Sequence, residues 1–165
     1  MPGKQIRDAI IRGIRPIEKN LRPAAQRKID EKTKPLGALG RLEDLALQMS
    51  LIQKNLNPDI NRKALYVFAG DHGIAAEGVS AYPAKVTGEM VKNILAGGAA
   101  INVLCRHYAV EIRVVDMGVN ADFEDHPLLL KKKIRKGTRN FAVEEAMTPE
   151  ESVRAVETGM QVFFV

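Results

Sequence analysis

The residues best suited to chemistry stand in one short stretch, residues 70–73, with the sequence GDHG. Asp71 and His72 supply a carboxylate and an imidazole, the usual groups for general acid and base catalysis. The stretch directly follows an apolar run, and open α/β sheets bind ligands where such buried strands end. The alternative is structural: Asp71 caps the next segment and His72 donates to a backbone carbonyl. The tetrapeptide alone leaves both interpretations open.

A second stretch, residues 78–83 with the sequence GVSAYP, leads into an expected helix. The N-terminal N–H groups of that helix and its small neighbours could line a pocket for a flat ligand or an anion. The alternative is an ordinary start of a helix. Glu89 lies two turns into the helix, where it could hydrogen-bond a heterocycle, although a solvated carboxylate is the commoner fate.

Three other motifs have a chemical and a plainer interpretation, and in each we favour the plainer one. Residues 97–100 (GGAA) could bring the backbone close to a ligand, but they also suit a tight turn between two helices. Residues 131–136 (KKKIRK) could bind nucleic acid, but acidic neighbours favour a solvated edge strand. Residues 137–140 (GTRN) could contact a phosphate or a ribose, or form a simple turn.

The first third of the sequence predicts helices. Residues 4–32 have apolar positions at helical spacing, and Pro16 and Pro23 fit the first turns of successive short helices. A loop is expected over residues 33–40, where a proline and two glycines break the pattern. Residues 41–55 predict an amphipathic helix. The side chains expected to form its buried face are Leu42, Leu45, Ala46, Met49 and Ile52.

The rest of the sequence predicts a parallel sheet. Residues 64–69 and 110–116 are expected to form buried strands, and helices are expected over residues 83–95 and 99–108 between them. Strand, helices and strand in this order form a right-handed crossover. A capping box of Thr148 and Glu151 predicts a last helix. The predicted class is α/β, a three-layer α/β/α fold with a parallel sheet and a small helical N-terminal subdomain.

Length and composition limit the possible classes of protein. With 165 residues, 45% of them apolar, the chain suits one domain, which we divide into a helical subdomain, residues 1–55, and a partial α/β domain, residues 56–165. No apolar run is long enough for a membrane span or a secretory signal, which predicts a cytoplasmic protein with no membrane partner. One cysteine, Cys105, expected to be buried, and three scattered histidines predict no metal site, and nothing implies a cofactor. Few aromatic residues make a nucleic-acid partner unfavoured despite a net charge of +5.

Several motifs in a fixed order resemble one enzyme family, the nicotinate-nucleotide:dimethylbenzimidazole phosphoribosyltransferases. The series consists of residues 33–43 (TKPLGALGRLE), 70–73 (GDHG), 78–83 (GVSAYP) with Val86 and Thr87, 97–102 (GGAAIN), 115–119 (VDMGV), 137–142 (GTRNFA) and 146–148 (AMT). The resemblance extends from about Leu21 to Gly159. It implies transfer of ribose 5-phosphate from nicotinate mononucleotide to a benzimidazole base, which gives α-ribazole phosphate and nicotinate in cobalamin biosynthesis.

The resemblance also implies roles for particular residues. The candidates for binding the base are Ser80, Ala81, Tyr82, Glu89 and Met90, and Asp71, His72 and Gly73 lie beside that pocket. The candidates on the nucleotide side are Gly98, Asn102, Thr138 and Asn140. Glu89 stands where the family commonly has glutamine, which could alter base preference because an ionised carboxylate accepts hydrogen bonds without donating them.

The resemblance covers only the N-terminal part of the longer family members. Their glycine-rich phosphate-binding segment and the late glutamate that acts as general base have no counterpart in this sequence, so no catalytic residue is identified. We therefore expect a truncated, split or degenerate member, acting as a homodimer or with a complementary C-terminal chain. Whether this chain alone is an enzyme stays open. The alternative is a non-catalytic binding or partner protein derived from the same family.

Overall fold

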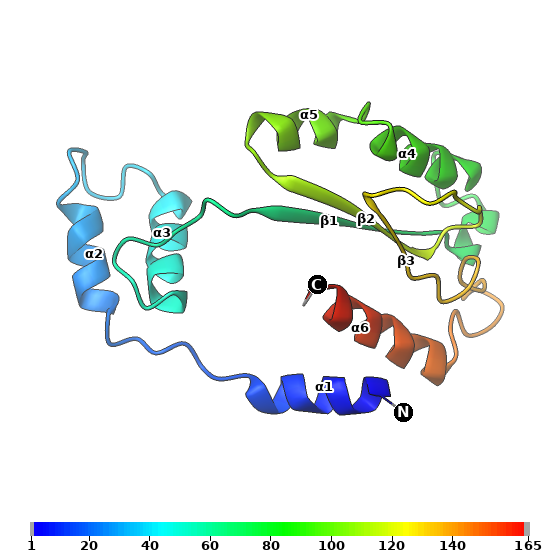
Figure 1. The fold of residues 1–165 in the computed structure, drawn as a ribbon, viewed down its shortest axis with the longest axis horizontal. Helices are drawn as coiled ribbons and strands as arrows, with labels where there is room; N and C mark the ends of the chain where they lie inside the picture. Colours follow the sequence, from blue (N-terminus) through cyan, green and yellow to red (C-terminus); the bar gives the residue numbers. More distant parts are fainter. Residues whose placement is uncertain (1, 164–165) are drawn as a thin grey trace. The chain divides into compact units, whose positions relative to one another are not determined.

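A three-stranded parallel sheet organises the larger part of the chain in the computed structural model, which describes residues 2–163 (Figure 1). The strands are β1 (Ala64–Gly70), β2 (Glu111–Gly118) and β3 (Leu129–Lys131), in the order β1-β2-β3. Val67 is in register with Val114, which in turn pairs with Leu129. The predicted crossover with parallel strands is confirmed.

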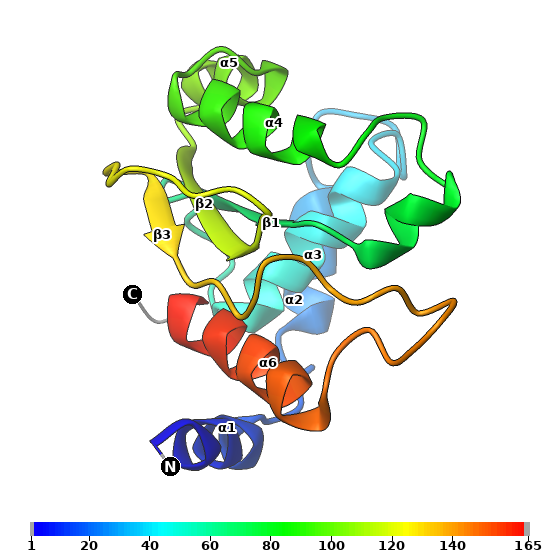
Figure 2. The same cartoon turned by 90° about the vertical axis from the view of Figure 1, so that its right-hand side faces the viewer.

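Helices cover both faces of this sheet. Helices α4 (Lys85–Leu95) and α5 (Ala100–His107) lie on one face, and α6 (Pro149–Phe163) lies on the other (Figures 1 and 2). The core under α4 and α5 contains these buried side chains: Val91, Ile94, Ala99, Cys105, Ile112, Val114, Val119 and Leu129. The three-layer α/β/α class is therefore confirmed, and so is the expected burial of Cys105.

The prediction that residues 64–69 form a buried strand is wrong about the burial. β1 lies at the edge of the three-stranded sheet, and its residues are half-buried or exposed. Phe68 is 52% exposed, whereas its partner in the register, Val115, is fully buried. An apolar run marks a strand but does not show whether the strand is central or at an edge. The central strand, β2, is the buried one.

The predicted edge strand over residues 131–136 is also misplaced, because β3 ends at Lys131. Beyond it the chain turns, and its lysines meet acidic partners from neighbouring segments: Lys131 pairs with Asp125, Lys133 with Asp116, and Lys136 with Asp122. Arg135 of the same run pairs with Glu151. Four charges of the basic run are thus paired within the protein, which weakens the nucleic-acid interpretation. The lysines are also not uniformly solvated, since the Lys133 side chain is only 23% exposed.

The chain forms two compact units, residues 1–10 with 63–165 and residues 11–62. Helix α1 (Pro2–Gly13) crosses from one unit to the other, and the smaller unit contains α2 (Arg22–Asp30) and α3 (Arg41–Ile52). Pro23 lies in the first turn of α2 as predicted, but Pro16 lies between helices rather than inside one. The predicted division of the chain at residue 55 stays a prediction.

The predicted buried face of α3 is wrong. Leu47, Ser50 and Leu51 are buried, and α2 packs against α3. Leu42 and Leu45, which were expected in the core, are 63% and 50% exposed. The helix carries apolar residues on more than one side, so spacing alone could not select the face that contacts α2.

Candidate functional site

A cavity of about 360 Å³ lies at the carboxyl end of β1. Gly70, Asp71 and His72 form one side of it, and the segment from Ile74 to Met90 forms the rest. The lining is mainly apolar: Ile74, Ala75, Val79, Tyr82, Pro83, Ala84, Val86 and Met90, with Ser80 and Thr87 as polar members. Its volume lies in the range of small-molecule sites, and its walls suit a flat apolar ligand.

Two of the motifs singled out in the sequence therefore meet in one place. The 3₁₀ helix η1 (Gly73–Glu77) turns the chain after β1, and the following loop brings residues 79–83 back to the start of α4. Of the base-binding candidates, Ser80, Tyr82 and Met90 line the cavity. The hydroxyl of Ser80 accepts a hydrogen bond from the Tyr82 backbone N–H at 3.3 Å, which shapes the turn before α4.

Two other base-binding candidates lie outside this cavity. Ala81 does not line it, although both of its neighbours do. Glu89 forms an ion pair with Lys92 at 2.9 Å, and its side chain is 69% exposed. It borders a separate cavity of about 250 Å³ with Asp71 and Asn120. That these five residues bind a base stays a prediction. The geometry favours Ser80, Tyr82 and Met90, which line the cavity at the end of β1.

Asp71 lies where three cavities meet. It lines the cavity at the end of β1, the one beside Glu89, and a third cavity of about 410 Å³ that His72, Gly73 and Thr138 also line. The Asp71 carboxylate does not cap the following helix, since its Oδ2 accepts a hydrogen bond from the Asn120 N–H at 2.7 Å. The alternative that Asp71 caps the next segment is therefore wrong, because its carboxylate accepts the N–H of Asn120 instead.

The segment after Gly137 holds the Asp71 loop in place. The Thr138 N–H donates to the Asp71 carbonyl at 3.0 Å, and the Thr138 hydroxyl accepts from the Gly73 N–H at 3.2 Å. Only glycine fits at position 73, because a Cβ there would lie 2.5 Å from the backbone of Arg139 and Asn140. The Asn140 amide donates to Glu77 at 2.5 Å. Thr138 borders the third cavity, whereas the Asn140 side chain is hydrogen-bonded to Glu77.

The remaining nucleotide-side candidates lie in the turn between α4 and α5. The buried Asn102 side chain accepts from the Ala99 N–H and donates to the Ile94 carbonyl, which closes the turn. A Cβ at Gly98 would collide with the side chain of Asn93. These contacts match the favoured interpretation of the glycine pair as a packing turn. Neither residue lines any of the three cavities that share Asp71.

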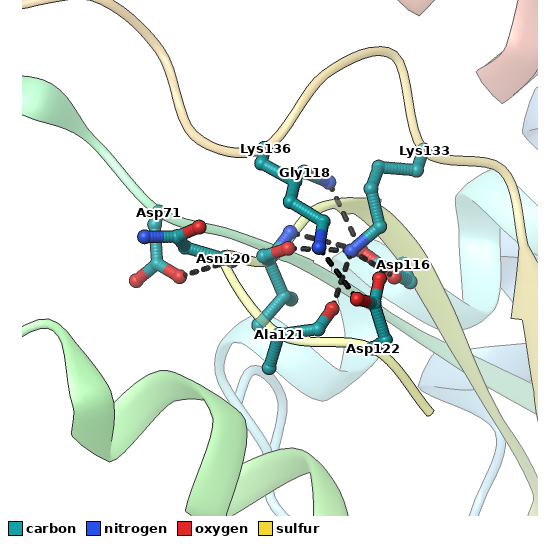
Figure 3. Close-up of polar contacts among 9 residues, drawn as sticks. Asp71, Asp116, Gly118, Asn120, Ala121, Asp122, Lys133 and Lys136 are labelled. Atoms are coloured by element: carbon teal, nitrogen blue, oxygen red, sulfur yellow. Dashed lines mark hydrogen bonds and ion pairs between the residues drawn. The ribbon is translucent and has the colours of Figure 1, made fainter. Parts of the chain in front are cut away.

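Sequence reasoning missed a buried ion pair beside the site. Asp116, at the end of β2, is 2% exposed and lies 2.9 Å from the Nζ atom of Lys133 (Figure 3). A carboxylate inside an apolar strand signals a buried partner. The partner itself could not be selected, because Lys133 is one of five basic residues between positions 131 and 136.

Comparisons with known proteins bear on the fold and the family of this chain. A phosphoribosyltransferase family model matches residues 14–164. Nicotinate-nucleotide:dimethylbenzimidazole phosphoribosyltransferase of Cupriavidus necator is 55% identical over 147 residues. The chain belongs to this family. The relative of the same name from Geobacter sp. strain M21 is 50% identical over 156 residues. The crystal structure of CobT from Thermus thermophilus superimposes with a TM-score of 0.80 at 46% identity.

The chain spans less than half the length of these relatives. The match with the Cupriavidus phosphoribosyltransferase covers 89% of this chain and 42% of the relative, and that with the Geobacter protein covers 94% and 45%. The Thermus structure is matched over 86% of this chain and 43% of its own. No helix among the described residues is long and apolar enough to cross a membrane. Within residues 2–163, no three His, Cys, Asp or Glu side chains gather as metal ligands would.

Proposed function

We propose that this chain supplies the base-binding pocket of a nicotinate-nucleotide:dimethylbenzimidazole phosphoribosyltransferase. The observation that carries the proposal is the apolar cavity of about 360 Å³ at the carboxyl end of β1, lined by residues of two family motifs. The relatives are named for dimethylbenzimidazole, a flat, mostly apolar heterocycle. A slot with apolar walls and a few polar groups at one edge suits such a ligand.

Different residues of the cavity contact different parts of the base. Tyr82 and Met90 offer an aromatic ring and a thioether that can contact the faces of the base. Ser80, Thr87 and Asp71 offer hydroxyl and carboxylate groups to its edge. Burial of the methyl-substituted ring supplies affinity, and the polar edge fixes the orientation in which a ring nitrogen can attack ribose.

A binding experiment tests the pocket. Wild-type chain is titrated with 5,6-dimethylbenzimidazole by equilibrium dialysis, together with Tyr82→Ala and, as a matched control outside the cavity, Tyr108→Ala. We expect Tyr82→Ala to weaken binding about fivefold through the lost ring contact. Tyr108→Ala should leave the affinity unchanged, since Tyr108 is an exposed tyrosine that lines none of the three cavities that share Asp71. No saturable binding by the folded wild-type chain would contradict the proposal.

Turnover is a separate question from binding. Release of nicotinate from nicotinate mononucleotide is measured with and without 5,6-dimethylbenzimidazole. Base-dependent release by the chain alone would assign it the complete transferase reaction. Saturable binding without release would favour a binding protein, or one half of a site completed by another chain or by a second copy.

A further inference from the structure

The Asp71 backbone is fixed from two sides at the meeting point of the three cavities. Its N–H donates to the Gly118 carbonyl at 3.0 Å, which extends the pairing of β1 with β2. Its carbonyl accepts from the Thr138 N–H at the same distance. Because both peptide groups are engaged, the carboxylate can change position only by rotation of its own side chain. What fixes that rotation decides what the site presents to a ligand.

One oxygen of the Asp71 carboxylate is occupied and the other is available. Oδ2 accepts the Asn120 N–H at 2.7 Å, a short charge-assisted hydrogen bond. Oδ1 accepts no hydrogen bond from any residue in the described part of the chain. Figure 3 shows this second oxygen turned away from the Asn120 turn. An ionised carboxylate oxygen without a partner accepts a hydrogen bond from a ligand N–H or O–H group.

The turn that carries Asn120 is built around the buried Asp116–Lys133 pair. Oδ1 of Asp116 accepts from the N–H groups of Gly118 and Val119, at 3.1 and 2.9 Å. The Lys133 ammonium lies 2.9 Å from Oδ2 of Asp116 and donates to the carbonyls of Val119 and Ala121 (Figure 3). The two charges therefore hold the peptide groups on both sides of Asn120.

We infer that Asp116 and Lys133 are positioning residues that orient the Asp71 carboxylate, leaving its Oδ1 to accept a hydrogen-bond donor of the ligand. This inference rests on the proposed function. The donor is either the ring N–H of the base or a ribose hydroxyl of nicotinate mononucleotide, whose pyridinium ring has no N–H. Lys133 donates to the carbonyls on both sides of Asn120, and the Asn120 N–H donates to the Asp71 carboxylate.

The test compares Asp71→Asn, Lys133→Met and the double variant, with Lys131→Met as a matched control. Lys131 belongs to the same basic run but pairs with Asp125, whose side chain is 98% exposed. Affinity is measured separately for 5,6-dimethylbenzimidazole and for nicotinate mononucleotide. We expect Asp71→Asn and Lys133→Met each to lower the affinity for one of these two ligands about tenfold. The double variant should be no weaker than Asp71→Asn, because Lys133 acts through Asp71.

A readout without ligand separates orientation from general stability. The amide proton of Asn120 is followed by NMR, since a bond to a carboxylate shifts it downfield. Asp71→Asn and Lys133→Met should both move this signal upfield, Lys133→Arg should largely retain it, and Lys131→Met should leave it in place. If Lys133→Met does not fold, Lys133→Arg and Asp71→Asn still decide the question. An Asn120 signal unchanged in Asp71→Asn would overturn the inference.

The ligand arms distinguish two failures. If wild-type chain binds neither ligand, the proposed function fails and this inference fails with it. If the wild-type chain binds, and Asp71→Asn binds both ligands as tightly as the wild-type chain does, only this inference is overturned. A double variant that is much weaker than Asp71→Asn would show that Lys133 acts by another route and would likewise overturn it.

Discussion

At the scale of single residues, acidic side chains close loops by accepting backbone N–H groups. Glu43 illustrates this: it accepts the Leu39 N–H at 3.0 Å and pairs with Lys34 at 2.9 Å. The backbone hydrogen bond from Leu39, followed by the hydrogen bond from Lys34, lowers the pKa of Glu43 from its ordinary value of 4.5. The carboxylate thus holds the loop of residues 33–40 against the start of α3.

This lowered pKa makes a prediction about stability and pH. A group whose pKa is lower in the folded state stabilises the fold above its unfolded pKa, and this contribution disappears as the pH falls through the folded value. Glu43→Gln should therefore be less stable than wild type at pH 7. The difference should shrink as the pH is lowered from 7 to about 3. Urea unfolding at both pH values checks this, and an equal difference at both would contradict it.

At the scale of elements, the clearest agreement with the sequence is the capping box of α6. The Thr148 hydroxyl accepts from the Glu151 N–H at 3.1 Å, and Glu151 accepts from the Thr148 N–H at 2.8 Å. That bond from Thr148, and then Arg139, lowers the pKa of Glu151. A cap could be predicted because all its partners lie within four consecutive residues.

Removing this cap should destabilise α6 by a known amount. We expect Thr148→Ala to cost about 1 kcal/mol of unfolding free energy, whereas Thr148→Ser, which keeps the hydroxyl, should cost far less. The measurement is urea unfolding, in which the midpoint concentration should shift while the dependence of the unfolding free energy on urea stays constant. Identical midpoints for the alanine and serine variants would mean that the cap does not stabilise the fold.

Features that depend on distant contacts could not be predicted as well as the cap. The spacing of Leu42 and Leu45 marked a helix correctly but selected the wrong face, because the choice depends on where α2 packs. The motifs at residues 70–73 and 78–83 could be singled out by their residue types, but that both line one cavity follows only from the fold. The Asp116–Lys133 pair joins residues 17 positions apart, and nothing local distinguishes Lys133 from its basic neighbours.

At the scale of the whole molecule, the exposed edge of the sheet predicts association. β1 has a strand neighbour on one side only among the described residues, and Phe68 is 52% exposed on it. Unpaired strand edges and exposed apolar side chains favour contacts between chains. We expect light scattering to show concentration-dependent association that Phe68→Glu reduces. A wild-type chain that stays monomeric at all concentrations would contradict this.

The most direct test of the proposed pocket is to fill it. Ala84 lines all three cavities that share Asp71, just before α4 begins, whereas Ala96, which is also exposed, follows the end of the same helix and lines none of them. Titration with 5,6-dimethylbenzimidazole should show affinity reduced more than about tenfold in Ala84→Trp and unchanged in Ala96→Trp. Equal affinity in wild type and Ala84→Trp would contradict binding of the base in this cavity.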